Sequence, residues 1–175
     1  MEFEKLIEER RSIRAYRNEK PAKQLIEKVL KEAQKAPSWK NSQTARVYAV
    51  YSDEMLAKVR ETLPSFNQKS SDGAVLLVTS FVTKVSGHTN GMPDNDGKDC
   101  WGAYDLGLHD AYLVLAAKDN GLDTLIMGIR DAEKLREVLN IPQEEQIMSV
   151  IALGYGNQTP ALRPRKDLGE VSSIL

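Results

Sequence analysis

Residues 74–82, AVLLVTSFV, form a nearly unbroken apolar run. A strand with one wet face alternates apolar and polar residues, whereas an unbroken run is typical of a strand that is covered on both faces. We therefore predict a β-strand here, at the centre of a sheet with other elements packed against both sides.

The residues on either side of this run predict further helices and strands. Helices are expected over 2–10, from Pro21 to about Ala36, over 53–63, from a capping Asp105 to about Asn120, and over 131–139; strands are expected over 46–51, 125–127 and 147–153. The long helix should bury Leu106, Leu113, Leu115 and Ala116, and the polar residues 86–100 should form a loop. Helices come first and strands then interleave with helices, so the fold class is α+β with helices on both sides of the sheet.

Composition limits the classes of function. A chain of 175 residues fits one domain, 1–175, and its formal net charge of -1 argues against a nucleic-acid partner. The single Cys100 excludes an intrachain disulfide and is compatible with a reducing compartment. No stretch has the composition of a signal peptide or the length of a membrane span, so we expect a cytoplasmic protein without a membrane partner.

Three arginines and a serine stand within Arg10-Arg11-Ser12-Ile13-Arg14. Guanidinium groups donate two hydrogen bonds at once to phosphate oxygens, so the cluster suits a phosphorylated cofactor. It could equally be a solvated turn neutralised by Glu8 and Glu9 at helical spacing. On these residues alone the two interpretations are about even.

A second basic cluster, Arg163-Pro164-Arg165-Lys166, follows the strand expected at 147–153. Proline favours an extended backbone, which would point both arginines the same way. Short basic runs are usually solvated, but a phosphate monoester is held best by cations that converge from separate segments. Arg10 and Arg14 could supply the other segment.

A third group of polar residues lies in Ala36-Pro37-Ser38-Trp39-Lys40-Asn41-Ser42-Gln43, between a predicted helix and a predicted strand. Small donors and acceptors beside an indole suit the edge of a flavin or a nucleotide. Taken alone, an ordinary connection whose side chains satisfy their own backbone is the better interpretation.

The order and spacing of these motifs resemble the FMN-dependent nitroreductase family. The resemblance rests on the cluster at 10–14, on Pro37-Ser38 with Asn41 and Gln43, on Met127-Gly128, and on Gly154-Tyr155 with Arg163-Pro164-Arg165. It covers essentially the whole chain. It departs from the family pattern at Thr44, where proline is common, at Met127, where glutamate is common, and in the shortness of the excursion at 86–101, which leaves the substrate open.

The resemblance implies an α+β nitroreductase-like fold with a central, mostly antiparallel sheet flanked by helices. It also implies an intertwined homodimer that holds FMN at its interface, with NADH or NADPH as reductant. Arg10, Ser12 and Arg14 would bind FMN, Arg11 would contribute mainly backbone, and Arg163 and Arg165 would close on the phosphate. Ser38, Trp39 and Asn41, next to Pro37, would reach the same flavin from the other subunit. Asn67 and Lys69 would lie at the pyrimidine edge, and Met127 and Gly128 would offer backbone N–H groups.

The implied activity is a ping-pong reduction of nitroaromatics, quinones or free flavins by NAD(P)H. Because the flavin carries the chemistry, no catalytic side chain and no metal is expected. His88 is expected in solvent, and His109 in the core or an interface. Two alternatives stay open: a flavin- or phospholigand-binding module without turnover, and a flavoenzyme of the same fold that acts on an enone or a halogenated aromatic.

Apolar residues without an evident place on a compact monomer favour dimerisation independently. They are the terminal segment 171–175 and the loop aromatics Trp39 and Trp101. The alternative is that they dock onto the chain's own core.

Overall fold

The computed structural model describes residues 2–97 and 100–175. Its helices are α1 (Phe3–Glu9), α2 (Lys23–Ala33), the 3-10 turn η1 (Trp39–Asn41), α3 (Asp53–Arg60), α4 (Ser65–Ser70), α5 (Cys100–Asp119), α6 (Ala132–Leu139) and α7 (Leu168–Val171). Its strands are β1 (Ala45–Val50), β2 (Val75–Val82), β3 (His88–Thr89), β4 (Met92–Pro93), β5 (Asp123–Met127) and β6 (Glu145–Gly154).

Four strands form the main sheet in the order β1-β2-β6-β5. Every neighbouring pair in it is antiparallel, and Val78 of β2 lies between Tyr48 of β1 and Val150 of β6. The register of β2 against β6 shifts at a bulge between Thr79 and Ser80. The expected central antiparallel sheet is therefore confirmed, with β2 inside it.

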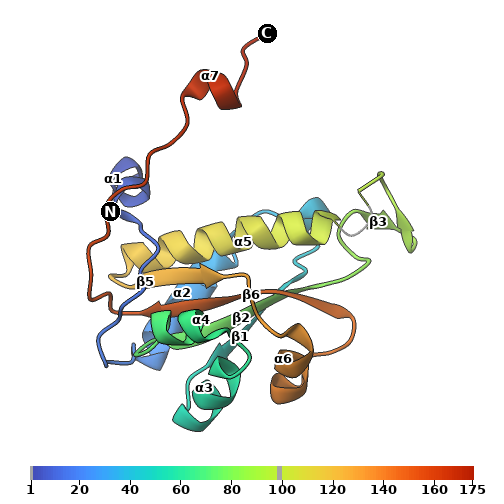
Figure 1. Ribbon diagram of the computed structural model, residues 1–175. Helices are drawn as coiled ribbons and strands as arrows, with labels where there is room; N and C mark the ends of the chain where they lie inside the picture. Colours follow the sequence, from blue (N-terminus) through green and yellow to red (C-terminus); the bar gives the residue numbers. More distant parts are fainter. Residues whose placement is uncertain (1, 98–99) are drawn as a thin grey trace.

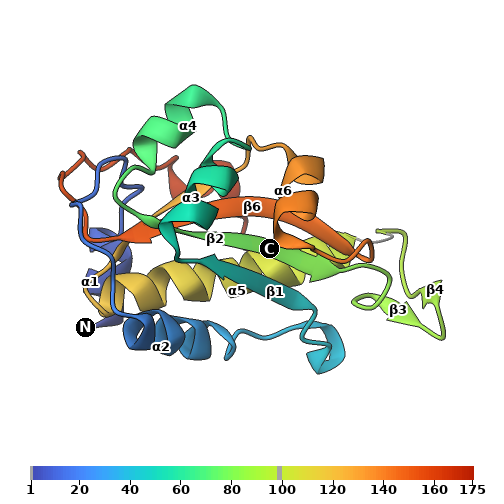
Figure 2. The ribbon, with the colours of Figure 1, turned by 90° about the horizontal axis from the view of Figure 1, so that it is seen from below.

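The two faces of β2 belong to two different cores. Leu76 and Val78 pack with residues of α3 and α6, whereas Val75 and Leu77 pack with residues of α2 and α5. Figure 2 shows α3, α4 and α6 on one side of the sheet and α2 and α5 on the other. Because both faces are covered, the residues at 74–82 have no reason to alternate in polarity.

Two helix predictions need correction. The long helix begins at Cys100, so Asp105 is an internal residue of α5 and not its cap. The helix expected over 53–63 ends at Arg60, and a separate short helix, α4, begins after Pro64. Leu115 and Ala116 are only partly buried, because the sheet and α2 cover a narrower stripe of α5 than expected.

The excursion expected at 86–101 contains a small antiparallel hairpin, β3–β4, near the start of α5 (Figure 1). Lys98 and Asp99 of this excursion lie outside the described residues. At the other end of α5, the chain after β6 passes α1 and continues as an arm that carries α7 away from the sheet (Figure 1). None of the described helices is long and apolar enough to span a bilayer.

Candidate functional site

The first arginine cluster is held in an extended backbone by two bridges to the sheet. Arg10 ends α1 in a β conformation. Ser12 forms a parallel bridge with Thr124 of β5, and Tyr16 forms an antiparallel bridge with Gly156 after β6. The segment therefore cannot continue α1 as a helix, and its position follows that of the sheet.

Side chains of an extended segment alternate between its two sides. Ile13 is buried in the core, and its neighbours Ser12 and Arg14 are exposed. The Arg11 side chain turns back to donate to the backbone carbonyls of Glu8 and Arg10. The Arg11 side chain is thus engaged within its own segment, and its backbone contribution to a ligand stays a prediction.

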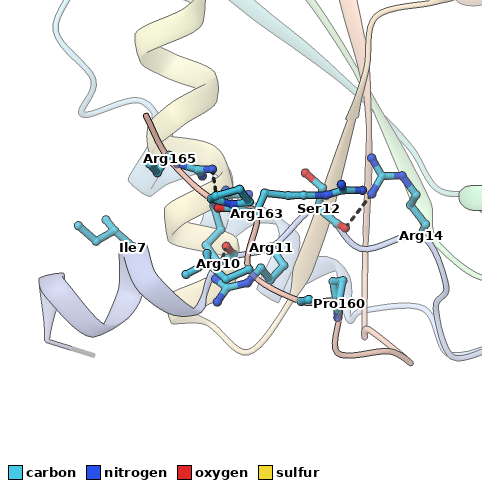
Figure 3. Close-up of a pocket in the computed structure, with 11 residues that line it drawn as sticks. Ile7, Arg10, Arg11, Ser12, Arg14, Pro160, Arg163 and Arg165 are labelled. Carbon is cyan, nitrogen blue, oxygen red and sulfur yellow. Dashed lines mark hydrogen bonds between the residues drawn. The ribbon is translucent and has the colours of Figure 1, made fainter. Parts of the chain in front are cut away.

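The two arginine clusters meet in one pocket of about 540 Å³. The pocket is lined by Ile7, Arg10, Arg11, Ser12, Arg14, Pro160, Ala161, Leu162, Arg163, Pro164 and Arg165, none of which is acidic. Figure 3 shows the side chains of the two segments gathered around it. Arg165 donates to the Arg163 carbonyl at 3.2 Å, which ties the second cluster together.

The electrostatics of the pocket favour an anion. Partial burial, followed by the positive charges of Arg165 and Arg11, lowers the pKa of Arg10. Of the two acidic residues that could neutralise the cluster, Glu9 pairs with Lys5 along α1 at 3.7 Å, and Glu8 offers its backbone carbonyl to Arg11. A phosphate placed among the arginines would relieve their mutual repulsion.

A second pocket, of about 490 Å³, shares Arg14 with the first. Lys69, expected at the pyrimidine edge, lines it together with Arg14 and the acidic Asp72. Asn67 is 8% exposed, and its amide donates to the Ile129 carbonyl at 3.4 Å. This bond places Asn67 against the loop that follows Met127 and Gly128.

Met127 and Gly128 come at the end of β5, where the chain leaves the sheet. Met127 is 2% exposed and belongs to the core, so its side chain is not available to a ligand. A side chain added at Gly128 would meet nothing within 4 Å, so the space beside this residue is open. The methionine that replaces the common glutamate is thus explained by packing.

The third predicted group forms a strained turn around η1. Lys40, Asn41 and Gln43 all have positive φ, at 47°, 55° and 48°. Such a conformation costs a non-glycine residue about 1 kcal/mol or more. Within the turn, the Ser38 hydroxyl accepts a hydrogen bond from the Gln43 backbone N–H at 3.0 Å.

Trp39 and Trp101 are not the separate exposed aromatics that the sequence suggested. Their rings pack together with centroids 4.5 Å apart, and Tyr104 packs edge-on against Trp101 at 5.2 Å. Both tryptophans are half-buried. The two rings meet because η1 and the start of α5 lie together in space, a proximity that the sequence does not reveal.

The sequence also missed the role of Asp105. Its side chain is 3% exposed and its Oδ2 atom accepts a hydrogen bond from the Trp39 amide at 3.0 Å. One signal was present: an acidic residue next to Leu106 on a mostly apolar helix must find buried donors. Because aspartate also suits a helix N-cap, the sequence alone does not distinguish the two roles of Asp105.

The two histidines lie apart from the arginine pocket and form no metal site with other described residues. His109 is buried as expected, with its Nδ1 atom 3.3 Å from Asp110, while His88 is half-buried in the hairpin and contacts the Ser86 carbonyl. In the described part of the chain, no group of three or more His, Cys, Asp or Glu side chains could hold a metal.

The end of α1 and the chain after β6, which line the arginine pocket, lie at one end of α5, and residues 39–41 lie at the other end (Figure 1). Asp105, near the start of the helix, contacts the turn, and Thr124, just beyond its end, bridges to Ser12. At 1.5 Å per residue, the span from Asp105 to Asp119 is about 20 Å. The predicted contacts at 37–41 therefore do not share a site with the arginines of the same chain.

A main antiparallel sheet covered on both faces, with an arginine pocket whose Ser12 bridges to the start of β5, defines an α+β protein that is suited to a phosphorylated ligand. The family model described as "Nitroreductase family" matches residues 7–155. The chain belongs to the nitroreductase family and is an oxidoreductase.

Individual relatives agree with this assignment. A protein of Archaeoglobus fulgidus, provisionally named NADH dehydrogenase/NAD(P)H nitroreductase, is 32% identical over 86% of this chain and 83% of its own length. A Bacillus subtilis protein named FMN reductase (NAD(P)H) is 27% identical over 92% of this chain and 68% of its own.

Among solved structures, a provisionally named nitroreductase from Exiguobacterium sibiricum, in complex with FMN, superposes with a TM-score of 0.88. It is 20% identical, and the match covers 100% of this chain and 98% of the other. This likeness confirms the nitroreductase fold.

Proposed function

We propose that the chain is an FMN-dependent NAD(P)H oxidoreductase that reduces nitroaromatics, quinones or related acceptors, acting as one FMN-binding domain. The observation that carries the proposal is the pocket in which Arg10, Ser12, Arg163 and Arg165 meet with no acidic residue among those that line it. The names of the Bacillus subtilis relative and of the Exiguobacterium structure supply the ligand, FMN.

The residues present fit this cofactor. The charge on Arg10 is disfavoured by burial and by Arg165, and a phosphate would compensate for both effects. Arg14 and Lys69 line the adjoining cavity, where a ring edge that gains negative charge on reduction would be stabilised. Asn67 would contact the same edge, and the backbone N–H groups of Met127 and Gly128 would face the ring from the end of β5.

When bound, FMN would supply hydride and electron transfer between NADH or NADPH and the acceptor in a ping-pong cycle. The protein's own residues bind and orient the cofactor and polarise its ring. Arginines hold the phosphate, and Arg14 and Lys69 set the electrostatic potential at the ring edge. No side chain need act as nucleophile or general base.

A second subunit would complete each site. Because the turn lies about 20 Å along α5 from the arginine pocket, a two-fold related copy with its α5 antiparallel would bring its Pro37, Ser38, Trp39 and Asn41 to this pocket. Apolar side chains that such a copy could cover are exposed at Phe3, Ile7, Tyr104, Tyr112, Ile126, Ile129, Leu168, Val171, Ile174 and Leu175. Light scattering at several concentrations should give twice the chain mass of 19.6 kDa; a constant monomer mass would reject the shared site.

The purified protein tests the function directly. It should be yellow with an FMN spectrum, bleach anaerobically with NADH or NADPH, and recolour when a nitroaromatic or a quinone is added. Bound FMN that neither nucleotide reduces would support a binding module without turnover. If NAD(P)H reduces the bound FMN and only an enone or a halogenated aromatic reoxidises it, the chain would be the flavoenzyme of the same fold that acts on those substrates. Failure to bind FMN would overturn the proposal.

A further inference from the structure

The turn Ser38–Ser42 does not hold its conformation by local preference. Lys40 and Asn41 have φ of 47° and 55°, in the left-handed region that favours glycine. Three hydrogen bonds close it from within: Ser42 N donates to the Trp39 carbonyl at 2.8 Å, Asn41 N to the Ser38 carbonyl at 3.0 Å, and Gln43 N to the Ser38 hydroxyl at 3.0 Å. Contacts from outside the turn must therefore stabilise this shape.

Asp105 supplies such contacts at both ends of η1. Its Oδ2 atom accepts from the Trp39 backbone amide at 3.0 Å and from the Ser42 hydroxyl at 3.5 Å. The carboxylate stands on α5, a helix that is packed against the sheet, so its position is fixed independently of the turn. Two separate points of the turn are thereby tied to a rigid element.

The same oxygen also holds the hairpin. Ser86, 1% exposed and just ahead of β3, donates its hydroxyl to Asp105 Oδ2 at 2.6 Å. A second link runs from Lys40 Nζ to Thr89 Oγ1 at 2.9 Å and to Asp94 Oδ2 at 3.2 Å. The turn and the hairpin thus share one buried acceptor, with an exposed ion pair beyond it.

We propose that Asp105 is a positioning residue of the cofactor site: its buried carboxylate sets the turn that carries Ser38, Trp39 and Asn41. The proposal rests on the proposed function, in which these residues contact FMN held by the other subunit. The three donors are neutral, and hydrogen bonds to a charged acceptor are the stronger kind. Without the acceptor, the Trp39 amide and the Ser86 hydroxyl lose their partner, and the turn relaxes.

The test compares Asp105→Ala with Asp105→Asn in the full chain. Asparagine keeps an oxygen acceptor, and alanine does not. Because Trp39 and Trp101 are the only tryptophans and their rings are in contact, near-ultraviolet circular dichroism before FMN is added reports the position of the turn. We expect the tryptophan signal to be lost in Asp105→Ala and retained in Asp105→Asn.

FMN titration gives the second readout. We expect the Kd to rise about tenfold in Asp105→Ala and less than about threefold in Asp105→Asn. The matched control is Asp110→Ala, which removes another buried aspartate of α5, one that accepts from Thr79 at 3.1 Å and contacts no residue of the turn among its described hydrogen bonds. This control should keep both the dichroism and the FMN affinity.

The outcomes separate the two proposals. An unchanged tryptophan signal and FMN affinity in Asp105→Ala, or equal losses in Asp110→Ala, would overturn the role of Asp105. If the alanine variant does not fold, Asp105→Leu, of similar volume but without an acceptor, makes the same comparison. If the parent binds no FMN, the proposed function fails, and the dichroism still decides whether Asp105 holds the turn.

Discussion

Arg10 and Arg165 line the same pocket although they lie 155 positions apart in the chain. Partial burial and the charge of Arg165 both lower the pKa of Arg10. Such a juxtaposition is unfavourable without a counter-charge and favourable around a phosphate dianion.

Removal of the second arginine cluster should weaken the binding of FMN but not that of riboflavin. The double variant Arg163→Gln/Arg165→Gln should raise the Kd of FMN about tenfold or more, because charge-assisted hydrogen bonds to phosphate are lost. Riboflavin lacks the phosphate, so its Kd should change little; fluorescence titration measures both. The control Lys5→Gln removes a charge from α1 outside the pocket, where Lys5 pairs with Glu9. An equal rise in the Kd of riboflavin, or an equal rise in the Kd of FMN in Lys5→Gln, would contradict a phosphate contact.

Neutralising Lys69 should lower the midpoint potential of bound FMN. Lys69 shares a cavity with Arg14, and a cation near the ring edge stabilises the reduced, more negative form. Lys69→Met should shift the potential downward by roughly 20 mV for each kcal/mol of lost stabilisation. Spectroelectrochemistry measures the shift. Lys69→Arg and the distant Lys58→Met should leave the potential close to that of the parent, and a potential unmoved in Lys69→Met would remove this role.

Two glycines of α5 should respond in opposite ways to alanine. A Cβ at Gly102 would lie 2.3 Å from the Phe81 ring, which is 1% exposed, so Gly102→Ala should destabilise the fold by about 1–3 kcal/mol. A Cβ at Gly107 would meet nothing within 4 Å, so Gly107→Ala should stabilise the helix by about 0.5–1 kcal/mol. Urea denaturation tests the pair; a stabilising Gly102→Ala would show that α5 lies farther from β2 than described.

Tyr48 should make stability depend on alkaline pH. Burial, and then its hydrogen bonds to Glu145 at 3.0 Å, raise the pKa of Tyr48 to about 12. The unfolded value is about 10. The folded state therefore keeps a proton that the unfolded chain loses, and this contribution to stability is complete below pH 10 and lost between pH 10 and about 12.

Tyr48→Phe tests this linkage. At pH 8 the variant should be less stable by about 1–2 kcal/mol, because the buried Glu145 loses the hydrogen bonds from partly buried Tyr48 and keeps the one from Ser80. Denaturation at a series of pH values should show the difference from the parent narrowing as the pH rises from 10 to 12. A difference that is constant over this range would refute the linkage.

The sequence by itself determined the central strand and its flanking helices. The unbroken run at 74–82 predicted a strand covered on both faces, and the family motifs predicted the antiparallel sheet; both are confirmed. The prediction succeeded here because the polarity of each residue in the run indicates whether that residue is buried. They failed at Asp105, where the same aspartate that would suit a helix cap is an internal residue with partners 19 and more positions away.

Only the tertiary structure decided what the charged and polar motifs do together. The sequence left the cluster at 10–14 evenly balanced between a solvated turn and an anion site. The bridges of Ser12 and Tyr16 to the sheet, and the return of the chain past α1 to place Arg165 in the pocket, favour the anion site. The physical reason is that propensity and periodicity depend on neighbours in the chain, whereas electrostatic convergence depends on distance in space.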